Sequence, residues 1–286
     1  MNDHPQLAVN NLTFRYQDNI ILKNLTMDFS AHQVTGIIGA NGCGKSTLFM
    51  NLSGILKPQS GLVLWRSAPL KYDKKSLQEL RKNVTTVFQD PDMQIFYTDV
   101  DSDIAFALRN LGVEEEEIKR RANEALHLVD ALAFRDKPVQ HLSFGQKKRV
   151  AIAGALVMQS DYLLLDEPTA GLDPAGRQQM INLLARIAAA GKHIVISSHD
   201  IDLIYQVCDG IYVMSHGEVC GYGTPESVFL QKEMIAAAGL EQPWLVKLHC
   251  ETGLPLCKTE QALFAQLQRQ IIPVTGTHEV MVWHFH

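Results

Sequence analysis

The sequence predicts an α/β fold in which a parallel sheet is covered by helices on both faces. Three short apolar runs, at residues 34–38, 162–165 and 194–197, have the length and composition of buried strands. Residues 175–190 carry apolar side chains on one helical face, and Gly191 follows as a stop signal. A strand, helix, strand order of this kind favours parallel pairing, because the crossover helix covers a face of the sheet.

Two further segments continue this pattern. Residues 46–56, after the first strand, have apolar side chains at helical spacing, and residues 57–61 are typical of a turn. From about residue 100 to 158 the pattern is helical with little strand signal, so we expect a mostly helical segment to interrupt the α/β order. The acidic residues 114–117 suit the positive end of a helix dipole, an interpretation we prefer to an acidic binding site.

The pattern changes again after about residue 223. Residues 225–240 and 259–269 each predict a helix, the second with Thr259 as its N-cap, and residues 278–286 alternate like a strand. We therefore expect a main domain over residues 1–225 and a small C-terminal appendage over 226–286, which serves dimerisation or regulation.

Composition excludes several classes of protein. The 286 residues are 46% hydrophobic and 20% charged, which is ordinary for a globular protein and too apolar for a disordered one. The net charge of −5 gives no reason to expect a nucleic-acid partner. Five scattered cysteines favour free thiols in a reducing cytoplasm. Residues 1–6 do not resemble a signal peptide, and the longest apolar run, 150–158, is too short to span a bilayer.

A phosphate-binding pattern, G-x-x-x-x-G-K-[ST], occurs at residues 39–46 as Gly-Ala-Asn-Gly-Cys-Gly-Lys-Ser. Glycines let the backbone wrap closely around phosphates, and the following helix offers its N–H groups to an anion. We expect Lys45 to meet the β/γ-phosphates and the Ser46 hydroxyl to ligate Mg²⁺. Cys43 contributes only its backbone, since no histidine base lies near it in sequence. The ATP-binding residues predicted in this segment are Gly39, Asn41, Gly42, Cys43, Gly44, Lys45, Ser46 and Thr47.

Two carboxylates follow the apolar run 162–165. Beside a phosphate loop, Asp166 can hold Mg²⁺, directly or through water. Glu167 points to the other side of the strand, where it can orient or deprotonate an attacking water. Acidic residues also end many strands without a catalytic role, so the phosphate loop is what favours this interpretation. His199, after the run 194–197, can sense the γ-phosphate or hold the water; a solvated loop histidine is the alternative.

In their order along the chain, these motifs resemble those of the ATP-binding subunits of ABC transporters. Residues 142–146, Leu-Ser-Phe-Gly-Gln, are similar to the family signature L-S-G-G-Q and precede Asp166, as in the family. The resemblance covers about residues 7–225. It implies a P-loop NTPase fold with a RecA-like parallel core, an N-terminal antiparallel β portion and an inserted helical subdomain at about 100–158.

The resemblance also implies roles for individual residues. Gln89 is similar to the loop glutamine that approaches the Mg²⁺ and water, and Tyr16 to the aromatic residue that stacks on adenine. Residues 171–173 resemble the loop that crosses to the partner subunit. The implied catalytic residues are Glu167, His199 and Gln89, the further ATP-binding residues are Tyr16, Ser143, Gly145 and Gln146, and the Mg²⁺ ligands are Ser46, Gln89 and Asp166.

The signature departs from the family pattern at Phe144, where the family has glycine. Ser143 and the Gly145 N–H can still meet a γ-phosphate at a helix N-terminus, so we expect Phe144 to point away from it. In the family this segment completes the ATP site of the opposite subunit. One chain with one motif set therefore implies a second ATPase subunit, in a twofold homodimer that ATP closes and hydrolysis opens.

Residues 89–96, Gln-Asp-Pro-Asp-Met-Gln-Ile-Phe, resemble a stretch of the energy-coupling-factor importers. This resemblance implies a peripheral subunit at the cytoplasmic face of the cell membrane. Its partners would be an integral membrane coupling subunit and substrate-binding membrane subunits. Within this group the chain most resembles the cobalt importers, which makes cobalt the favoured substrate and nickel or a vitamin the alternatives.

Other functions are less well supported. A soluble ABC protein of DNA repair or translation would carry two motif sets or a long coiled-coil insertion, and the sequence has neither. The intact Glu167 and His199 argue against a regulatory domain without turnover, and the lack of fused membrane helices disfavours an exporter. His278, His284 and His286 have a weak metal-ligand spacing, so a surface strand or a frayed tail is the preferred interpretation there.

Overall fold

The computed structural model describes residues 6–270. The chain divides between Pro243 and Trp244 into two compact units, each of which is described by itself. This division is one of compactness, and the functional division expected after residue 225 stays a prediction. Within residues 6–270, no helix combines the length and the apolar character needed to cross a membrane.

The first unit contains a six-stranded sheet in which five neighbouring strands are parallel. The order is β10-β9-β3-β8-β7-β6, and only β10 runs antiparallel to its neighbour. Every residue of β3, β7 and β8 is buried, as expected for strands covered on both faces. The strands predicted at 34–38, 162–165 and 194–197 are thereby confirmed. The bounds are β3 (Val34–Ile38), β6 (Val84–Val87), β7 (Tyr162–Asp166), β8 (His193–Ser198), β9 (Gly210–Ser215) and β10 (Glu218–Gly223).

The register of this sheet aligns the carboxyl ends of its parallel strands. Ile38 pairs with Ser198 across β3 and β8, and Ser197 pairs with Asp166 across β8 and β7. Leu165 and Val87 are partners in β7 and β6. The loops that follow β3, β8, β7 and β6 therefore leave the sheet along one edge.

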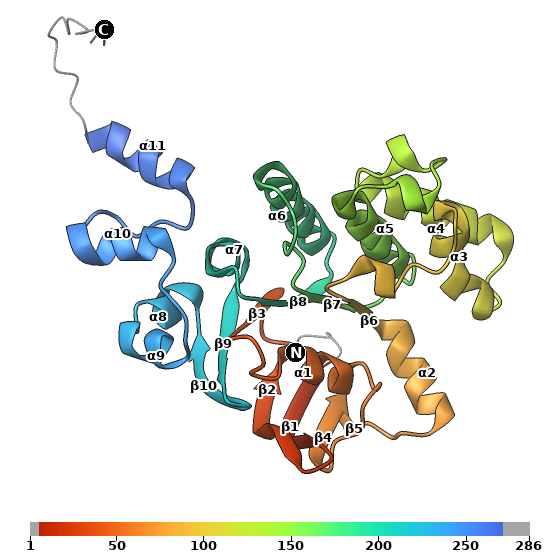
Figure 1. Cartoon of the computed structure of the whole chain (residues 1–286), viewed down its shortest axis with the longest axis horizontal. Coiled ribbons are helices and arrows are strands. Elements are labelled where there is room, and N and C mark those ends of the chain that lie inside the picture. The colour runs from red at the N-terminus through yellow and green to blue at the C-terminus, as the bar shows by residue number, and fades with distance from the viewer. Residues whose placement is uncertain (1–5, 271–286) are drawn as a thin grey trace, which may run out of the picture. The chain divides into compact units, whose positions relative to one another are not determined.

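A second sheet, antiparallel throughout, confirms the expected N-terminal β portion. Its order is β2-β1-β4-β5, and α1 lies between it and the six-stranded sheet (Figure 1). Leu48, Phe49 and Leu52 of α1 are fully buried in the core between the sheets, where each contributes about 2 kcal/mol. The bounds are β1 (Leu7–Tyr16), β2 (Asn19–Asp28), β4 (Ser60–Trp65), β5 (Ala68–Pro69) and α1 (Lys45–Leu52).

Helix α1 is shorter than the helix predicted at 46–56. Gly54 adopts a φ of +67°, in the left-handed region that glycine tolerates, and the chain turns there. The N–H groups of Ile55 and Leu56 both donate to the carbonyl of Met50, which closes the helix end.

Helices on the other side of the sheet complete the layers. α6 (Pro174–Ala189) and α7 (Ile201–Val207) cover the face opposite α1 (Figure 1). The segment 100–158 contains α3 (Val100–Asn110), α4 (Glu115–Leu128) and α5 (Phe144–Leu156), which pack on one another. α2 (Lys74–Asn83) precedes β6, and short 3-10 turns are η1 (Pro91–Met93), η2 (Leu132–Phe134) and η3 (Val139–His141).

The single helix predicted over 225–240 is wrong. The structure has α8 (Pro225–Phe229) and α9 (Lys232–Ala237), separated at Gln231, whose backbone has φ −83° and ψ 72°. The Gln231 side-chain amide donates to the Ser227 carbonyl at 3.0 Å, and so occupies an acceptor that a continuing helix would use.

The second unit contains α10 (Trp244–Thr252) and α11 (Glu260–Gln270). The predicted cap of the latter is confirmed, because Thr259 Oγ1 accepts a hydrogen bond from the Ala262 N–H at 3.1 Å. The strand predicted at 278–286, with its three histidines, lies outside the described residues.

Candidate active site

Residues 39–46 form a tight loop between β3 and α1, and its glycines are required by packing. A Cβ on Gly39 would lie 2.3 Å from the Met214 carbonyl oxygen and 2.6 Å from Cys43 Sγ. Gly44, the N-cap of α1, has a φ of +109°, and a Cβ there would lie 2.6 Å from Leu22 Cδ2. Residues of the neighbouring strands β9 and β2 thus leave no room for a side chain at positions 39 and 44, and only glycine fits there.

The loop holds its lysine inward. Lys45 is buried, and its Nζ donates to the carbonyls of Gly39 at 2.8 Å and Ala40 at 3.3 Å. The following Ser46 is exposed in the first turn of α1. An anion at this turn would meet the helix N–H groups and a buried cation together.

Cys43 lies in the same loop but is not suited to react. Its side chain is buried, and burial raises the pKa of its thiol, so the nucleophilic thiolate is disfavoured. A backbone contact of Cys43 with ATP stays a prediction.

Asp166 ends β7 at the same edge of the sheet. It is buried, and its Oδ1 accepts a hydrogen bond from the Ser197 hydroxyl on β8. Gln89, two residues beyond the end of β6, is exposed. The predicted Mg²⁺ ligands Ser46, Asp166 and Gln89 offer hydroxyl, carboxylate and amide oxygens, and such a donor set suits Mg²⁺.

Glu167 is held in an unusual conformation. Its φ is +48°, which is rare for a residue with a side chain. Its carboxylate Oε2 accepts hydrogen bonds from Ser198 Oγ at 3.1 Å and from the His199 N–H at 3.2 Å, and it lies 2.8 Å from His199 Nδ1. No described residue donates to Oε1, which leaves that oxygen to accept a proton from a water.

The structure therefore brings Glu167 and His199 into direct contact, which the sequence did not reveal. Sequence reasoning also missed Ser197, Ser198 and Lys148. The two serines directly precede His199, and that adjacency was an available signal. Lys148 donates from Nζ to the carbonyls of Glu167 at 2.8 Å and Pro168 at 3.1 Å, and burial lowers its pKa to about 8. Nothing in the sequence distinguishes Lys148 from its less buried neighbours Lys147 and Arg149.

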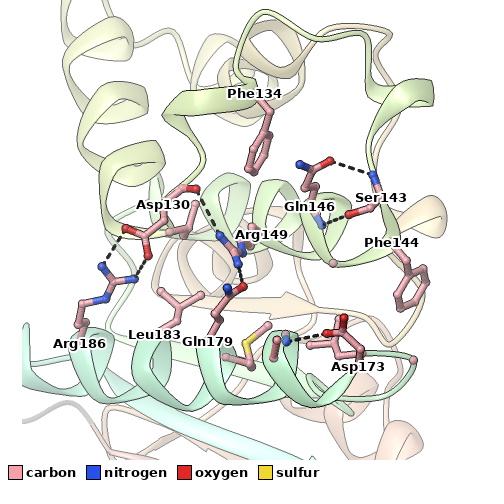
Figure 2. A pocket seen from close by; sticks show the side chains of 17 residues that line it. Asp130, Phe134, Ser143, Phe144, Gln146, Arg149, Asp173, Gln179, Leu183 and Arg186 are labelled. Carbon is pink, nitrogen blue, oxygen red and sulfur yellow. Dashed lines mark hydrogen bonds and ion pairs between the residues drawn. The ribbon is translucent and has the colours of Figure 1, made fainter.

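The signature residues lie at the start of α5, on the wall of a 470 Å³ pocket between α5 and α6 (Figure 2). Ser143 caps the helix: its Oγ accepts from the Gln146 N–H at 3.3 Å, and Gln146 Oε1 accepts from the Ser143 N–H at 2.9 Å. Among the described residues, no hydrogen bond or ion pair joins Ser143, Gly145 or Gln146 to the phosphate loop. One chain thus presents two separate groups of predicted site residues.

Phe144 packs onto its own chain. Its side chain extends beside the start of α6, away from Gln146 (Figure 2). A Cβ on Gly171, whose φ is +75°, would lie 2.9 Å from the Phe144 ring, and the Lys148 Nζ stands 5.3 Å from the ring centroid.

Tyr16 lies at the end of β1, beside α1. Its ring is 46% exposed and meets Phe14 edge-on at 4.9 Å, and its hydroxyl lies 3.9 Å from Met50 Sδ. Met50 is one turn beyond Ser46 on α1. This leaves an aromatic face open for stacking near the helix that follows the phosphate loop.

Comparisons with known proteins agree with these motifs. A family model described as "ABC transporter" matches residues 22–170. The chain is 64% identical to the cobalt import ATP-binding protein CbiO of Salmonella typhimurium, over 92% of this chain and 97% of that protein. It is 48% identical to the energy-coupling factor transporter ATP-binding protein EcfA of Methanocaldococcus jannaschii, over 83% of this chain and 85% of that protein.

Solved structures show the same likeness. CbiO1 of Clostridium perfringens, described as part of the ABC transporter complex CbiONQ, superposes with a TM-score of 0.74 and 40% identity, covering 91% of this chain and 98% of that one. The dimeric bacterial ABC transporter cassette MJ0796 gives a TM-score of 0.68 and 26% identity, covering 77% and 98%.

We predict that Lys45→Ala weakens ATP binding by tenfold or more, which corresponds to about 1.4 kcal/mol, because the phosphates lose a buried cation. Titration with a fluorescent ATP analogue measures the affinity, and Lys75→Ala, at an exposed lysine of α2, is the control. An unchanged affinity in a folded variant would contradict the predicted role of Lys45.

We predict that Glu167→Gln leaves ATP binding intact and lowers hydrolysis by about 100-fold or more, because the amide cannot take a proton from water. The variant should also accumulate as an ATP-bound dimer in size-exclusion chromatography. Glu218→Gln, at an exposed carboxylate of β10, is the matched control. Near-normal turnover, or a monomer in the presence of ATP, would show that Glu167 is not the base.

Proposed function

Since this chain belongs to the ATP-hydrolysing subunits of ABC transporters, in the energy-coupling-factor group, we propose that it powers the import of cobalt through membrane partner subunits. The observation that carries the proposal is the 64% identity to CbiO along almost the whole of that protein. An importer of nickel or of a vitamin would use the same ATPase chemistry, because the transported species need not touch this subunit.

We assign the chemistry to residues along one edge of the sheet. Lys45 and the N–H groups of residues 39–47 would bind the phosphates of ATP, with Tyr16 stacked on the adenine. Ser46, Asp166 and Gln89 would hold Mg²⁺, which when bound neutralises the phosphate charge. Glu167 Oε1 would accept the proton of the attacking water, while the contacts of its Oε2 fix the direction of the carboxylate. His199, in contact with Glu167, would orient the water or the γ-phosphate.

The second proposed feature is a homodimer with two shared ATP sites. The phosphate loop and the signature residues form separate groups within one chain, so an opposite copy would bring Ser143 and the Gly145 N–H to the γ-phosphate. The dimeric MJ0796 cassette supports this arrangement. ATP would hold the two faces together, and loss of the γ-phosphate contacts after hydrolysis would let them part.

The third feature is a docking surface for a helix of the integral membrane coupling subunit. Met93 and Phe96 are 72% and 75% exposed, and Phe106 is 40% exposed. These apolar side chains lie on a well-held segment: Asp103 Oδ1 accepts from the Phe96 N–H at 2.8 Å, and Asp92 pairs with Lys147 at 2.7 Å. A group of large apolar side chains that face water is typical of an interaction site.

A largely apolar groove of 750 Å³ extends from this segment. It lies between α2, β6, α3 and the end of α5, and an amphipathic helix is the kind of element that binds in an apolar groove. The groove's apolar lining includes Leu77, Val84, Phe88, Ala107, Leu111 and Met158. Docking there would place the subunit at the cytoplasmic face of the membrane. A helix bound in the groove would contact α5 and the segment that carries Gln89, so it would move with them when the dimer opens.

Reconstitution tests the proposed substrate. Vesicles that contain this chain and its membrane partners should accumulate radioactive cobalt when ATP is supplied, and the same vesicles with Glu167→Gln should not. Nickel and a labelled vitamin serve as competitors, since preferential uptake of either one would replace cobalt as the substrate. Uptake that proceeds equally well with the Glu167→Gln variant would overturn the role as a motor.

We predict that Phe96→Asp reduces co-purification with the membrane subunits by about tenfold or more, because a charge replaces an apolar contact at the docking surface. Leu230→Asp, at another exposed apolar side chain, should co-purify normally. The amount of coupling subunit retained on an affinity-tagged chain is the measurement. Equal retention of the two variants would place the membrane partner on another face.

A further inference from the structure

Lys148 is a buried cation that the mechanism above does not use. Its exposure is 3%, and no carboxylate lies within ion-pair distance of its ammonium among the described residues. The ammonium is satisfied instead by the carbonyls of Glu167 and Pro168. A buried charge costs free energy even when it is hydrogen-bonded, and an apolar side chain would pack there at lower cost. Stability alone therefore does not account for a lysine at this position.

Lys148 contacts the backbone of Glu167, the proposed base. Glu167 has the left-handed φ of +48°, and a peptide in this conformation needs support from its surroundings. Lys148 fixes the Glu167 carbonyl from the α5 side at 2.8 Å, while Ser198 and His199 fix the carboxylate from the β8 side. The direction of Oε1 is thus set by contacts on both sides of the residue.

Lys148 also contacts Phe144 in the signature turn, residues 142–146. The Lys148 ammonium stands over the Phe144 ring, at 5.3 Å from its centroid, one helical turn away on α5. Phe144 directly follows Ser143 and also packs against Gly171. A movement of the signature turn would therefore shift the ring, the ammonium and the peptide of Glu167 together.

We propose that Lys148 is a positioning residue that couples the two ATP sites of the dimer by linking the signature turn to the backbone of Glu167. This proposal rests on the proposed function, because in the dimer Ser143 and Gly145 face the partner's nucleotide while Glu167 acts on the nucleotide of its own loop. Lys148 then transmits the occupancy of one site to the base of the other. Phe144, where the family pattern has glycine, supplies the aromatic surface for this contact.

Steady-state hydrolysis by the purified full-length chain, measured over a range of ATP concentrations, tests the proposal. Lys148→Met keeps the length of the side chain and removes the cation. We expect kcat to fall by about tenfold, KM for ATP to change by less than about twofold, and the Hill coefficient to fall toward one. Lys148→Arg, which keeps a cation and several donors, should recover most of kcat and of the cooperativity.

Lys192→Met is the matched control. Lys192 is also partly buried and donates to a backbone carbonyl, that of Ser160, at 2.7 Å. Ser160 and Lys192 directly precede β7 and β8, so they lie at the amino-terminal ends of these strands, away from the site. This variant should keep the wild-type kcat and Hill coefficient.

Several results would overturn the proposal. A folded Lys148→Met variant with wild-type kcat and Hill coefficient would do so. Equal decreases of kcat in Lys148→Met and Lys148→Arg, in proportion to a lower melting temperature, would also do so. If Lys148→Met does not fold, Phe144→Leu and Phe144→Tyr replace it: Tyr should preserve cooperativity and Leu reduce it, and equal behaviour of the two would contradict the coupling. A wild-type chain that does not hydrolyse ATP as a dimer would instead refute the proposed function.

Discussion

The parallel register of β3, β8 and β7 is the constraint on which the rest of this structure depends. Because Ile38, Ser198, Ser197 and Asp166 are aligned across β3, β8 and β7, the loops that carry the predicted site residues leave the sheet along one edge. A shift of one residue would turn Asp166 to the other face of the sheet and separate it from the Ser197 hydroxyl. The buried side chains of both faces specify this register, so the core and the site are fixed by the same packing.

The polar groups at this edge are paired with one another. Asp166 accepts from Ser197 and Glu167 from Ser198, so two adjacent serines of β8 each orient one carboxylate. Ser197 and Ser198 are consecutive in β8, so their hydroxyls point to different sides of that strand. This arrangement suits the separate roles proposed for the two carboxylates, and Glu167, with its unusual backbone, is held from the α5 side and the β8 side.

A single chain presents its functional surfaces on separate elements. The phosphate loop lies at the start of α1, the signature residues cap α5, and the exposed apolar segment around Phe96 lies between β6 and α3. Helix α5, which begins with the signature residues, contacts the backbone of Glu167 through Lys148 and the segment before Phe96 through the Lys147–Asp92 ion pair. A subunit that has to transmit nucleotide state to a partner benefits from a rigid helix in this central position.

The sequence by itself determined three central strands of the parallel sheet, the phosphate-loop motif and the order of the motifs, because these depend on local apolar runs, glycines and charged residues at fixed spacing. It did not determine that the helix predicted at 225–240 breaks at Gln231, where a side-chain amide competes for a backbone acceptor. Nor did it indicate that His199 contacts Glu167, or that Lys148 rather than Lys147 is buried. The last two facts arise between residues 19 and 32 positions apart in the sequence, and only the tertiary structure, which brings α5 to the end of β7 and pairs β7 with β8, decides them.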